Sequence, residues 1–553
     1  MDKIWLKSYQ SGIPATIEDQ IEKYRSLGDL LEESFSKFSQ NQAFNCMGKG
    51  HTYQEVDQLS QQFASYLQND LKLQKGDRVA LMMPNILQYP VALFGILRGG
   101  FVAVNVNPLY TARELQHQLK DSGAKAIIIF ESGCATLQSV LDKTDIKHVI
   151  TTNIGDMLGF PKSLIVNLVI KKVKKMVPAW NIPNAKNFVT ELSRGQAKNF
   201  KKPELKPADI AFLQYTGGTT GVAKGAILTH RNMIANMCQA RAWLSPAISI
   251  GSETIISPLP LYHIFSLTVS FIFASVGGNN VLITNPRDMG GFIKEIKKWK
   301  FTVITGVNTL FNGLLNNAEF ATVDFSHMKL SVGGGMAVQK AVAEKWKKVT
   351  GKTLIEAYGL TETSPAACVN PLNIKEFNGF IGLPISSTDV VIKDDNDKTL
   401  PVGETGEICI KGPQVMPGYW NRDDETAKVM TADGFFKSGD IGIMNSDGFI
   451  KIVDRKKDMI LVSGFNVYPN EIEDVVATHP KVFEVAAIGI PDEKSTEAVK
   501  LFIVKKDESL TAEEIIAFCR TQLTSYKIPK TVEFRTELPK TNVGKILRKD
   551  LRQ

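Results

Sequence analysis

The sequence predicts an α/β protein built on parallel β-sheets. Two apolar runs indicate buried strands, Arg78–Met83 (RVALMM) and Ala124–Phe130 (AKAIIIF), and a helical stretch at Thr111–Lys120 lies between them. Apolar β runs separated by helices are typical of parallel sheets that carry helices on both faces. Ligands of such sheets bind beyond the carboxyl ends of the strands, so Gly-rich turns at those ends are the candidate sites.

Length and composition bound the class of protein. A chain of 553 residues is too long for one hydrophobic core, so several domains are expected. Its 43% hydrophobic and 22% charged residues exclude a disordered or fibrous protein. The formal charge of +8 suits anionic ligands. Basic residues cluster only in one short segment, so no nucleic-acid partner is expected.

The cysteines and histidines give no sign of a metal or disulfide scaffold. The six cysteines form no CxxC pair, and the seven histidines include no HExxH motif. The first residues, MDKIWLKSYQ, lack the basic start and apolar stretch of a secretory signal. These features predict a cytoplasmic location.

One segment, Gly159–Trp180 (GFPKSLIVNLVIKKVKKMVPAW), differs from its surroundings. Its apolar run lies beside Lys171, Lys172, Lys174 and Lys175, and it is shorter than the roughly 20 residues that span a bilayer. A helix with these two faces can lie at a membrane surface. The alternative is a helix packed on the core with a solvated lysine edge. The membrane-surface helix predicts peripheral association with the inner face of the cell membrane.

The character of the chain changes near residue 455. A charged, turn-like stretch, Val453–Asp458, follows the strand-like run Phe449–Val453, and the remainder is a charged α/β mixture with a clear helix at Ala512–Gln522. We therefore expect two domains, residues 1–454 and 455–553, with a boundary at about 454–458.

The strongest local signal is Tyr215–Ala226, YTGGTTGVAKGA, which follows the apolar run Ile210–Leu213. Glycines let the backbone approach phosphate oxygens, threonine hydroxyls add donors, and Lys224 supplies a cation. No Gly-Lys-Ser/Thr triplet closes the loop, so it is not a Walker A motif. The alternative is a flexible surface loop, but the density of Gly and Thr favours phosphate binding.

Four further segments carry candidate chemistry. The glycines of Ser331–Met336 (SVGGGM) allow a flat ring to lie against bare backbone, and EAYGLTETSP, starting at Glu356, offers an aromatic ring and a carboxylate. A carboxylate beside a triphosphate is a natural Mg²⁺ ligand. Asp440, in KSGDIG, suits ribose hydroxyls, and Lys545 lies in a Gly-Lys turn near the carboxyl terminus. Each segment alone is also compatible with a structural role. Their occurrence together in this order favours a functional site.

This ordered set resembles the adenylate-forming superfamily and, within it, the bacterial long-chain fatty acyl-CoA synthetases. The resemblance extends from TYQEVDQLSQQFASYL to KTNVGKILRKDL, and Asp433–Lys457 (DGFFKSGDIGIMNSDGFIKIVDRKK) resembles the fatty-acyl-CoA synthetase signature. The superfamily's commonest phosphate loop carries Pro where Ala223 stands here. The resemblance implies a large N-terminal domain of two doubly wound sheets plus a small β-barrel, and a smaller mobile α+β C-terminal domain.

The resemblance also implies the activity and the partners. It implies ligation of a long-chain fatty acid to coenzyme A through an acyl-adenylate, with ATP and Mg²⁺, releasing AMP and pyrophosphate. Homodimerisation and peripheral membrane contact through 159–180 are further expectations.

Roles follow from the resemblance residue by residue. Lys545 would bridge the fatty carboxylate and the α-phosphate, Thr361 would meet the α-phosphate, and His263 would stand at the acyl site. Thr216 and Glu362 would lie near Mg²⁺, and Lys457 would be the hinge about which the small domain turns. The catalytic set is Lys545, Thr361, Glu362 and His263. The residues expected to bind ATP or coenzyme A are Tyr215, Thr216, Gly217, Gly218, Thr219, Thr220, Gly221, Lys224, Gly333, Gly334, Gly335, Glu356, Ala357, Tyr358, Gly359, Asp440, Arg455, Lys457 and Gly464.

Other functions remain open from the sequence. An aryl- or medium-chain acid ligase would use the same scaffold, and His263 is also compatible with an internally hydrogen-bonded core histidine. A peptide-synthetase adenylation domain is disfavoured because no carrier domain follows before Gln553, and a luciferase-like oxygenase because Leu461 stands where that relative carries a lysine. A non-catalytic nucleotide-binding protein is disfavoured by the presence of Lys224, Glu362, Asp440 and Lys545 together.

Overall fold

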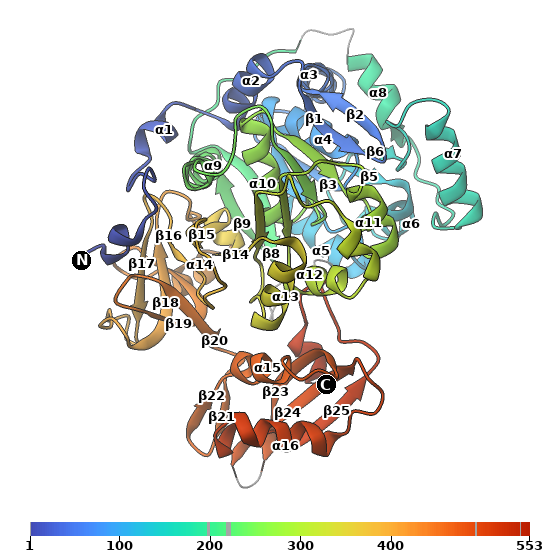
Figure 1. Ribbon diagram of the computed structural model, residues 1–553. Coiled ribbons are helices and arrows are strands. Elements are labelled where there is room, and N and C mark those ends of the chain that lie inside the picture. The colour runs from blue at the N-terminus through green and yellow to red at the C-terminus, as the bar shows by residue number, and fades with distance from the viewer. Residues whose placement is uncertain (1, 196–199, 217–222, 493–494, 542–543, 553) are drawn as a thin grey trace.

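The computed structural model describes residues 2–195, 200–216, 223–492, 495–541 and 544–552. Figure 1 shows a large body with a small antiparallel sheet on its flank near the N-terminus, and a smaller C-terminal unit below it. The predicted α/β architecture of parallel sheets is confirmed.

The first large sheet has nine strands. Its central strands are parallel, and antiparallel pairs close both edges. In spatial order the strands are β16 (Leu383–Pro384), β15 (Ala366–Val369), β14 (Leu354–Gly359), β13 (Leu330–Gly333), β12 (Val303–Gly306), β10 (Thr254–Ser257), β11 (Asn279–Leu282), β1 (Gln42–Cys46) and β2 (Lys49–Thr52).

The second large sheet has seven strands and is parallel except for the β8–β9 hairpin at one edge. In spatial order the strands are β7 (Lys186–Asn187), β6 (His148–Thr152), β5 (Ala126–Phe130), β3 (Arg78–Met82), β4 (Val102–Asn105), β8 (Ile210–Thr216) and β9 (Lys224–Thr229). The predicted strands at 78–83, 124–130 and 210–213 are therefore β3, β5 and the first part of β8.

The helices of the large body join the two sheets into one unit. The largest core includes Phe44 and Ile255 from the nine-stranded sheet and Leu81 and Phe212 from the seven-stranded sheet. The helices of this body are α1 (Glu18–Glu22), α2 (Leu27–Lys37), α3 (Tyr53–Asn69), α4 (Gln88–Arg98), α5 (Ala112–Ser122), α6 (Cys134–Gln138), α7 (Lys162–Leu168), α8 (Phe188–Gly195), α9 (His230–Leu244), α10 (Ile264–Ser275), α11 (Met289–Ile296), α12 (Asn308–Leu315) and α13 (Lys340–Thr350).

The predicted helix at 111–120 shows how local sequence sets an element. Thr111 is the N-cap of α5, and it forms a capping box with Glu114, in which each side chain accepts from the other residue's backbone N–H. Gly123 ends the helix in the left-handed conformation, where φ is 59° and glycine carries no steric penalty.

A four-stranded antiparallel sheet stands where the resemblance implied a small β-barrel. Its order is β17 (Asp389–Lys393), β18 (Thr405–Lys411), β19 (Phe436–Met444) and β20 (Ile450–Arg455), and α14 (Asp423–Val429) lies between β18 and β19 in the chain. Among the described residues no pairing of β17 with β20 closes the ring.

The C-terminal unit is an α+β fold with a core of its own. Its sheet holds β21 (Ile460–Val462), β22 (Phe465–Val467), β23 (Val482–Asp492), β24 (Thr496–Lys505) and β25 (Thr531–Arg535). Its helices are α15 (Pro469–Val476) and α16 (Ala512–Gln522), the second with the predicted bounds.

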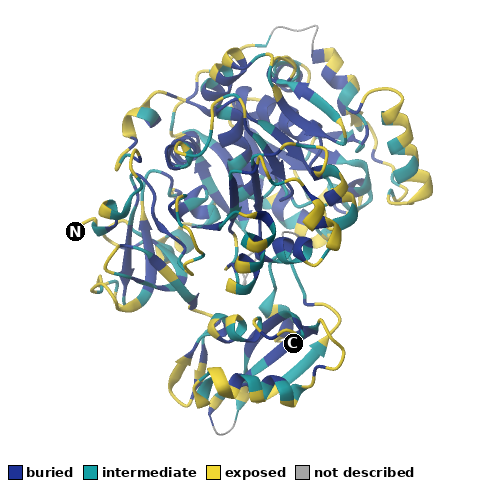
Figure 2. Cartoon of the chain, viewed as in Figure 1, coloured by how far each residue is buried: buried dark blue, intermediate teal, exposed yellow. Residues whose placement is uncertain are grey.

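The segment 159–180 touches the core at few points, where Val166 and Trp180 are partly buried against it. The helix α7 and the π-helical turn Val169–Val173 that continues it bury no residue. Figure 2 shows this helix as the exposed projection on the right of the view. None of the described helices is both long and apolar enough to cross a bilayer.

Candidate active site

The centre of the candidate site is a buried carboxylate with two partners. Asp440 on β19 is 4% exposed. It accepts a 2.7 Å hydrogen bond from the hydroxyl of Tyr358, and its other oxygen lies 3.1 Å from Nε of Arg455. The strand register sets the second contact, since Asp440 pairs directly with Arg455 across β19 and β20. This carboxylate raises the pKa of the Arg455 guanidinium, which therefore stays charged.

Lys545 reaches the same place from the C-terminal unit. Burial and the charge of Arg455 lower the pKa of Lys545 to about 8, while Asp440 opposes the shift. Burial and the charge of Arg455 also lower the pKa of Lys457. The charge of Lys457 lowers the pKa of Lys545 less than the charge of Arg455 does. The structure thus brings together the predicted residues Asp440, Arg455, Lys457 and Lys545.

His263 is another of the predicted catalytic residues. It is the N-cap of α10, and its Nδ1 accepts a 3.4 Å hydrogen bond from the backbone N–H of Phe265. Burial lowers the pKa of His263 to about 4, and the positive charge of Lys545 contributes. The imidazole is therefore neutral at neutral pH and offers a polar but uncharged surface beside Lys545.

The Gly-rich turn after β13 leaves bare backbone beside Tyr358. A Cβ at Gly334 would lie 3.0 Å from the carbonyl oxygen of Ala357 and 3.3 Å from the ring of Phe265. A Cβ at Gly333 would lie 2.8 Å from Val338. Gly333 and Gly334 therefore let this turn pack closely against its neighbours in the protein.

The predicted Mg²⁺ carboxylate and the loop lysine are linked through a tyrosine. Glu362, in the 3₁₀ turn Thr361–Thr363, is buried and accepts a 2.7 Å hydrogen bond from Tyr419. The ammonium of Lys224 lies 4.9 Å from the centre of the Tyr419 ring. Lys224 also pairs with Glu425 of α14 at 2.5 Å, and this contact holds the pKa of Glu425 at about 2. Half-buried Thr361 starts the same turn.

The segment that carries Tyr419 is fastened to the strand that follows the phosphate loop. The backbone of Trp420 donates to the carbonyl of Gly225 at 2.8 Å, and Ile227 donates to Gly418 at 3.0 Å. Tyr215 is held from the other side, because its hydroxyl donates to Asp121 at 2.7 Å. Both edges of the hairpin β8–β9 are thus fixed.

Some predicted residues lie apart from this centre. Gly217, Gly218, Thr219, Thr220 and Gly221 lie outside the described residues. Gly464 lies in the hairpin β21–β22 at the edge of the C-terminal sheet, and no recorded hydrogen bond or ion pair of the described residues joins it to the centre.

Three residues of the β14 segment have structural contacts. The carboxylate of Glu356 accepts from the backbone N–H of Val338 at 3.1 Å, and burial raises its pKa to about 8. Gly359 packs on β15, where a Cβ would overlap the carbonyl of Pro365. Ala357 pairs with Val369 across β14 and β15.

The sequence did not indicate Tyr419, Glu425 or Asp121. The sequence signal of Tyr419 and Glu425 is weak: YWNRDDET joins two aromatic residues to an acidic helix start, which is typical of many surface helices. Their partners Glu362, Lys224 and Tyr215 are distant in the chain, so only the tertiary structure reveals the contacts.

The donor set fits Mg²⁺ held together with nucleotide phosphates. The described residues contain no group of three or more His, Cys, Asp or Glu side chains placed to hold a metal. Mg²⁺ bound with a nucleotide uses one or two carboxylates, phosphate oxygens and waters, so the single carboxylate of Glu362 is sufficient.

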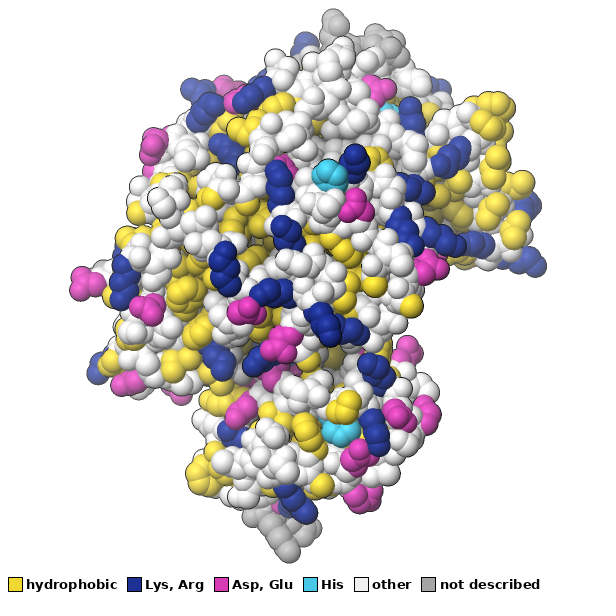
Figure 3. All heavy atoms as spheres, viewed as in Figure 1, with side chains coloured by type: hydrophobic (Ala, Val, Ile, Leu, Met, Phe, Trp, Pro, Cys, Tyr) yellow, Lys and Arg dark blue, Asp and Glu magenta, His cyan; other side chains and the backbone are white. Residues whose placement is uncertain are grey.

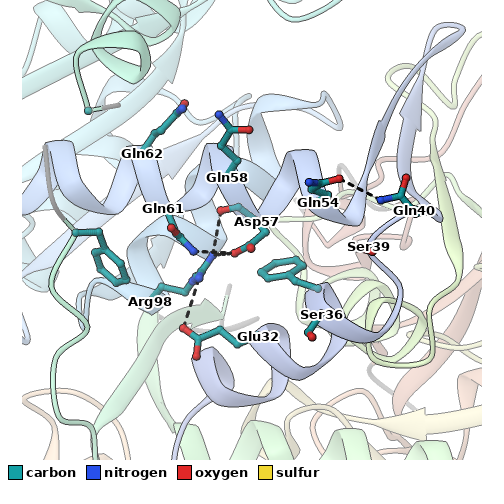
Figure 4. A pocket seen from close by; sticks show the side chains of 13 residues that line it. Glu32, Ser36, Ser39, Gln40, Gln54, Asp57, Gln58, Gln61, Gln62 and Arg98 are labelled. Atoms are coloured by element: carbon teal, nitrogen blue, oxygen red, sulfur yellow. Dashed lines mark hydrogen bonds and ion pairs between the residues drawn. The ribbon is translucent and has the colours of Figure 1, made fainter. Parts of the chain in front are cut away.

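A separate hollow of about 1020 Å³ lies between α2 and α3 and is shown in Figure 4. Its cation, Arg98, is neutralised by Asp57 at 2.6 Å and Glu32 at 3.4 Å. None of the predicted site residues lines this hollow, so it is not part of the candidate active site.

Comparison with known proteins places the chain in a family. It belongs to the AMP-binding enzymes: the family model for the AMP-binding enzyme matches residues 31–420, and that for the AMP-binding enzyme C-terminal domain matches 471–545. A long-chain-fatty-acid–CoA ligase of Escherichia coli O6:H1 is 56% identical over 553 residues, covering 100% of this chain and 98% of the relative. One of Haemophilus influenzae is 53% identical over 555 residues, with the same coverage.

Solved structures share the fold. ATP-bound MatB from Rhodopseudomonas palustris superimposes with a TM-score of 0.81 at 26% identity, over 95% of this chain and 98% of that chain. The anthranilate CoA ligase AuaEII in complex with anthranoyl-AMP gives a TM-score of 0.84 over 96% of each chain. At 24% identity the second shows the fold alone.

Proposed function

We propose that this protein ligates a long-chain fatty acid to coenzyme A through an acyl-adenylate, using ATP and Mg²⁺ and releasing AMP and pyrophosphate. The family and relatives 53–56% identical over the whole chain support this activity. The observation that carries it is the position of Lys545, whose ammonium lies in the field of Arg455 and Asp440.

The first half-reaction activates a poor electrophile. A fatty carboxylate resists nucleophiles because attack adds charge to an anion. When its oxygen attacks the α-phosphorus of ATP, a carboxylate O–P bond forms, the bond to pyrophosphate breaks, and the product is a mixed anhydride. The step needs two anions brought into line in a site that stabilises their charge. A protonated Lys545 supplies that charge between carboxylate and α-phosphate.

Other side chains orient the nucleotide. Asp440 accepts from the ribose hydroxyls while Tyr358 and Arg455 hold it in place, and bare Gly333–Gly335 backbone faces the adenine. Thr216, Lys224 and Glu362 would lie on the phosphate side, where Thr216 and Glu362 would hold Mg²⁺, which would supply charge stabilisation to the phosphates. The contacts of Asp440 with Tyr358 and Arg455, and of Glu362 with Tyr419, support these roles.

The second half-reaction needs no protein nucleophile. The thiol of coenzyme A attacks the activated carbonyl, a thioester bond forms, and the C–O bond to AMP breaks. All six cysteines are buried, and burial raises the pKa of thiols such as Cys46 and Cys519, both to about 11. They remain protonated and unreactive at neutral pH.

We further propose two domains, 1–454 and 455–553, that turn about 454–458. Lys545 and the incoming thiol approach the same carbonyl, so one rigid arrangement serves both steps poorly. Asp454, the last residue of the first domain, contacts the second domain across this boundary. It is fully buried at the end of β20 and accepts from Asn470 at 2.8 Å and from Arg548 at 3.3 Å. In this account Lys457 and Gly464 belong to the turning domain, Gly464 facing coenzyme A.

Peripheral membrane contact through 159–180 is a separate proposal. Exposed apolar side chains on this projection include Phe160 at 84%, Leu164 at 63% and Val173 at 72%. Exposed Lys172, Lys174 and Lys175 lie at its end. Figure 3 shows the mixture of hydrophobic and basic side chains on the right flank. An apolar face flanked by lysines suits anionic lipid. Homodimerisation stays a prediction, which sedimentation analysis of the protein would test.

The activity is tested by thioester formation from ATP, Mg²⁺, coenzyme A and saturated fatty acids of graded length. We expect activity that depends on all four and is highest with long chains. Turnover with aryl or short acids alone would contradict the substrate class, and absence of any acid dependence would contradict the activity.

A further inference from the structure

Two polar side chains on one face of α12 contact the C-terminal unit. The hydroxyl of Thr309 donates to the carbonyl of Gly544 at 2.9 Å, and the amide of Asn312 donates to the carbonyl of Phe483 at 3.2 Å. Residues three apart on a helix share a face, so the two contacts form one surface. Figure 1 shows α12 at the lower edge of the large body, next to the C-terminal unit.

The approach at Gly544 is too close for a side chain. Its φ is +83°, and a Cβ there would lie 2.7 Å from the hydroxyl of Thr309 and 3.4 Å from Val307. Glycine is therefore required at this position both for the backbone conformation and for the contact.

Gly544 and Lys545 are both hydrogen-bonded to Thr541. Thr541 accepts from the backbone N–H of Gly544 at 2.9 Å, and its hydroxyl accepts from the N–H of Lys545 at 3.1 Å. The backbone N–H of Thr541 donates to the carbonyl of Lys545 at 2.7 Å. A contact at Gly544 thus determines where the next residue, Lys545, projects.

We propose that α12 is the docking element of the orientation in which Lys545 is in the site, and that Thr309 is a positioning residue for that lysine. The inference rests on the proposed function. Both acceptors are backbone carbonyls, and they lie in two separate elements of the turning unit. Rotation of that unit therefore breaks both hydrogen bonds. The contacts belong to one orientation and have no role in thioester formation.

Two like charges also lie near each other at this interface. Burial and the nearby charge of Lys506 lower the pKa of Lys345 on α13. Like charges that approach across an interface disfavour it. A directional hydrogen bond at Thr309 therefore affects the balance between docked and released states.

The test separates the two half-reactions in single turnover. Thr309→Val keeps the shape and removes the donor. We expect acyl-adenylate formation from ATP and fatty acid to fall by roughly 3- to 10-fold, as the loss of one hydrogen bond implies. Thioester formation from supplied acyl-adenylate should stay within about two-fold of wild type, because that step does not use the contact. Gly544→Ala, which adds the excluded Cβ, should show the same selectivity with a larger loss.

The matched control is Thr353→Val. Thr353 also donates to a backbone carbonyl, that of Lys375, at 2.8 Å, but on the large body alone. Thr353→Val should leave the rates of both half-reactions unchanged. If Thr309→Val unfolds the protein, Asn312→Leu takes its place. Equal loss in both half-reactions, or an unchanged adenylation step, would overturn the inference. Failure of the wild type to release pyrophosphate with fatty acid would instead count against the proposed function.

Discussion

The hydroxyl of Tyr358 donates a 2.7 Å hydrogen bond to Asp440, and this bond joins β14 of the nine-stranded sheet to β19 of the small antiparallel sheet. Arg455 contacts the same carboxylate from the last position of β20. Asp440 therefore lies where the large body, the small sheet and the start of the C-terminal unit meet.

Asp440→Asn should weaken ATP binding, because the amide offers one acceptor fewer and leaves Arg455 without its ion pair. We expect the dissociation constant for ATP, measured by calorimetry without fatty acid, to rise roughly 10-fold, as the loss of a hydrogen bond to a charged group implies. The matched control is Asp397→Asn, which removes a 2.8 Å pair with Lys437 in the same small sheet. An unchanged constant for Asp440→Asn would exclude the ribose role.

Lys545→Ala should impair adenylation selectively. Removing one preorganised group that stabilises transition-state charge costs roughly 10²- to 10³-fold in rate. Fatty-acid-dependent pyrophosphate release should fall by that factor, while thioester formation from supplied acyl-adenylate changes little. Lys540→Ala is the control, since Lys540 lies in the same C-terminal segment and pairs with Glu484 at 2.7 Å. Equal losses in the two half-reactions would contradict the assignment.

The adenylation step should lose activity as the pH rises through about 8, the lowered pKa of Lys545. The ammonium is charged below its pKa and neutral above it, so the charge needed by the two anions disappears on the alkaline side. The profile of kcat/KM for fatty acid reports the free enzyme. Lys545→Arg should remove this limb, because a guanidinium stays protonated. A limb that persists in this variant would assign the ionisation to another group.

Glu362→Gln should raise the Mg²⁺ concentration needed for half-maximal adenylation. The amide keeps an acceptor for Tyr419 but removes the charge that attracts the cation, so we expect a shift of roughly 10-fold or more. Glu33→Gln is the matched control: Glu33 also accepts from a tyrosine hydroxyl, that of Tyr24, at 2.9 Å, far along the chain from the site. If both variants titrate like wild type, Glu362 does not hold the ion.

Replacing Leu164, Ile165 and Leu168 by Ser should reduce binding to anionic vesicles. These side chains are 57–63% exposed on α7, so the change removes apolar surface that lipid would cover without opening a core. We expect co-sedimentation to fall several-fold while activity on dispersed fatty acid is retained. Val402→Ser, at an apolar position that is 50% exposed, is the control. Unchanged sedimentation would exclude this segment as the contact.

The sequence predicted the elements with strong local signals. The strands β3, β5 and β8 are apolar runs, and α5 begins at a Thr111–Glu114 capping box, so their positions follow from short stretches of chain. Asp440, Arg455 and Lys545 were singled out from separate motifs, and they lie near one another in the fold, while their roles stay predictions.

Contacts between distant segments could not be predicted. Tyr419 is 57 residues from Glu362, and Thr309 is 235 residues from Gly544, so neither pairing leaves a periodic or spaced pattern. The exposure of α7 was equally undecidable, because a Leu- and Val-rich helix with lysines fits a core edge as well as a free surface. Only the packing of neighbouring elements distinguishes the two.

The acyl-adenylate is tested most directly with fatty acid labelled with ¹⁸O in both carboxylate oxygens. Attack of the carboxylate on the α-phosphorus leaves one carboxylate oxygen on phosphorus when the thiol displaces AMP. The account predicts AMP that carries one ¹⁸O, one pyrophosphate and one thioester per turnover, measured by mass spectrometry. Unlabelled AMP, or formation of ADP and phosphate, would contradict it.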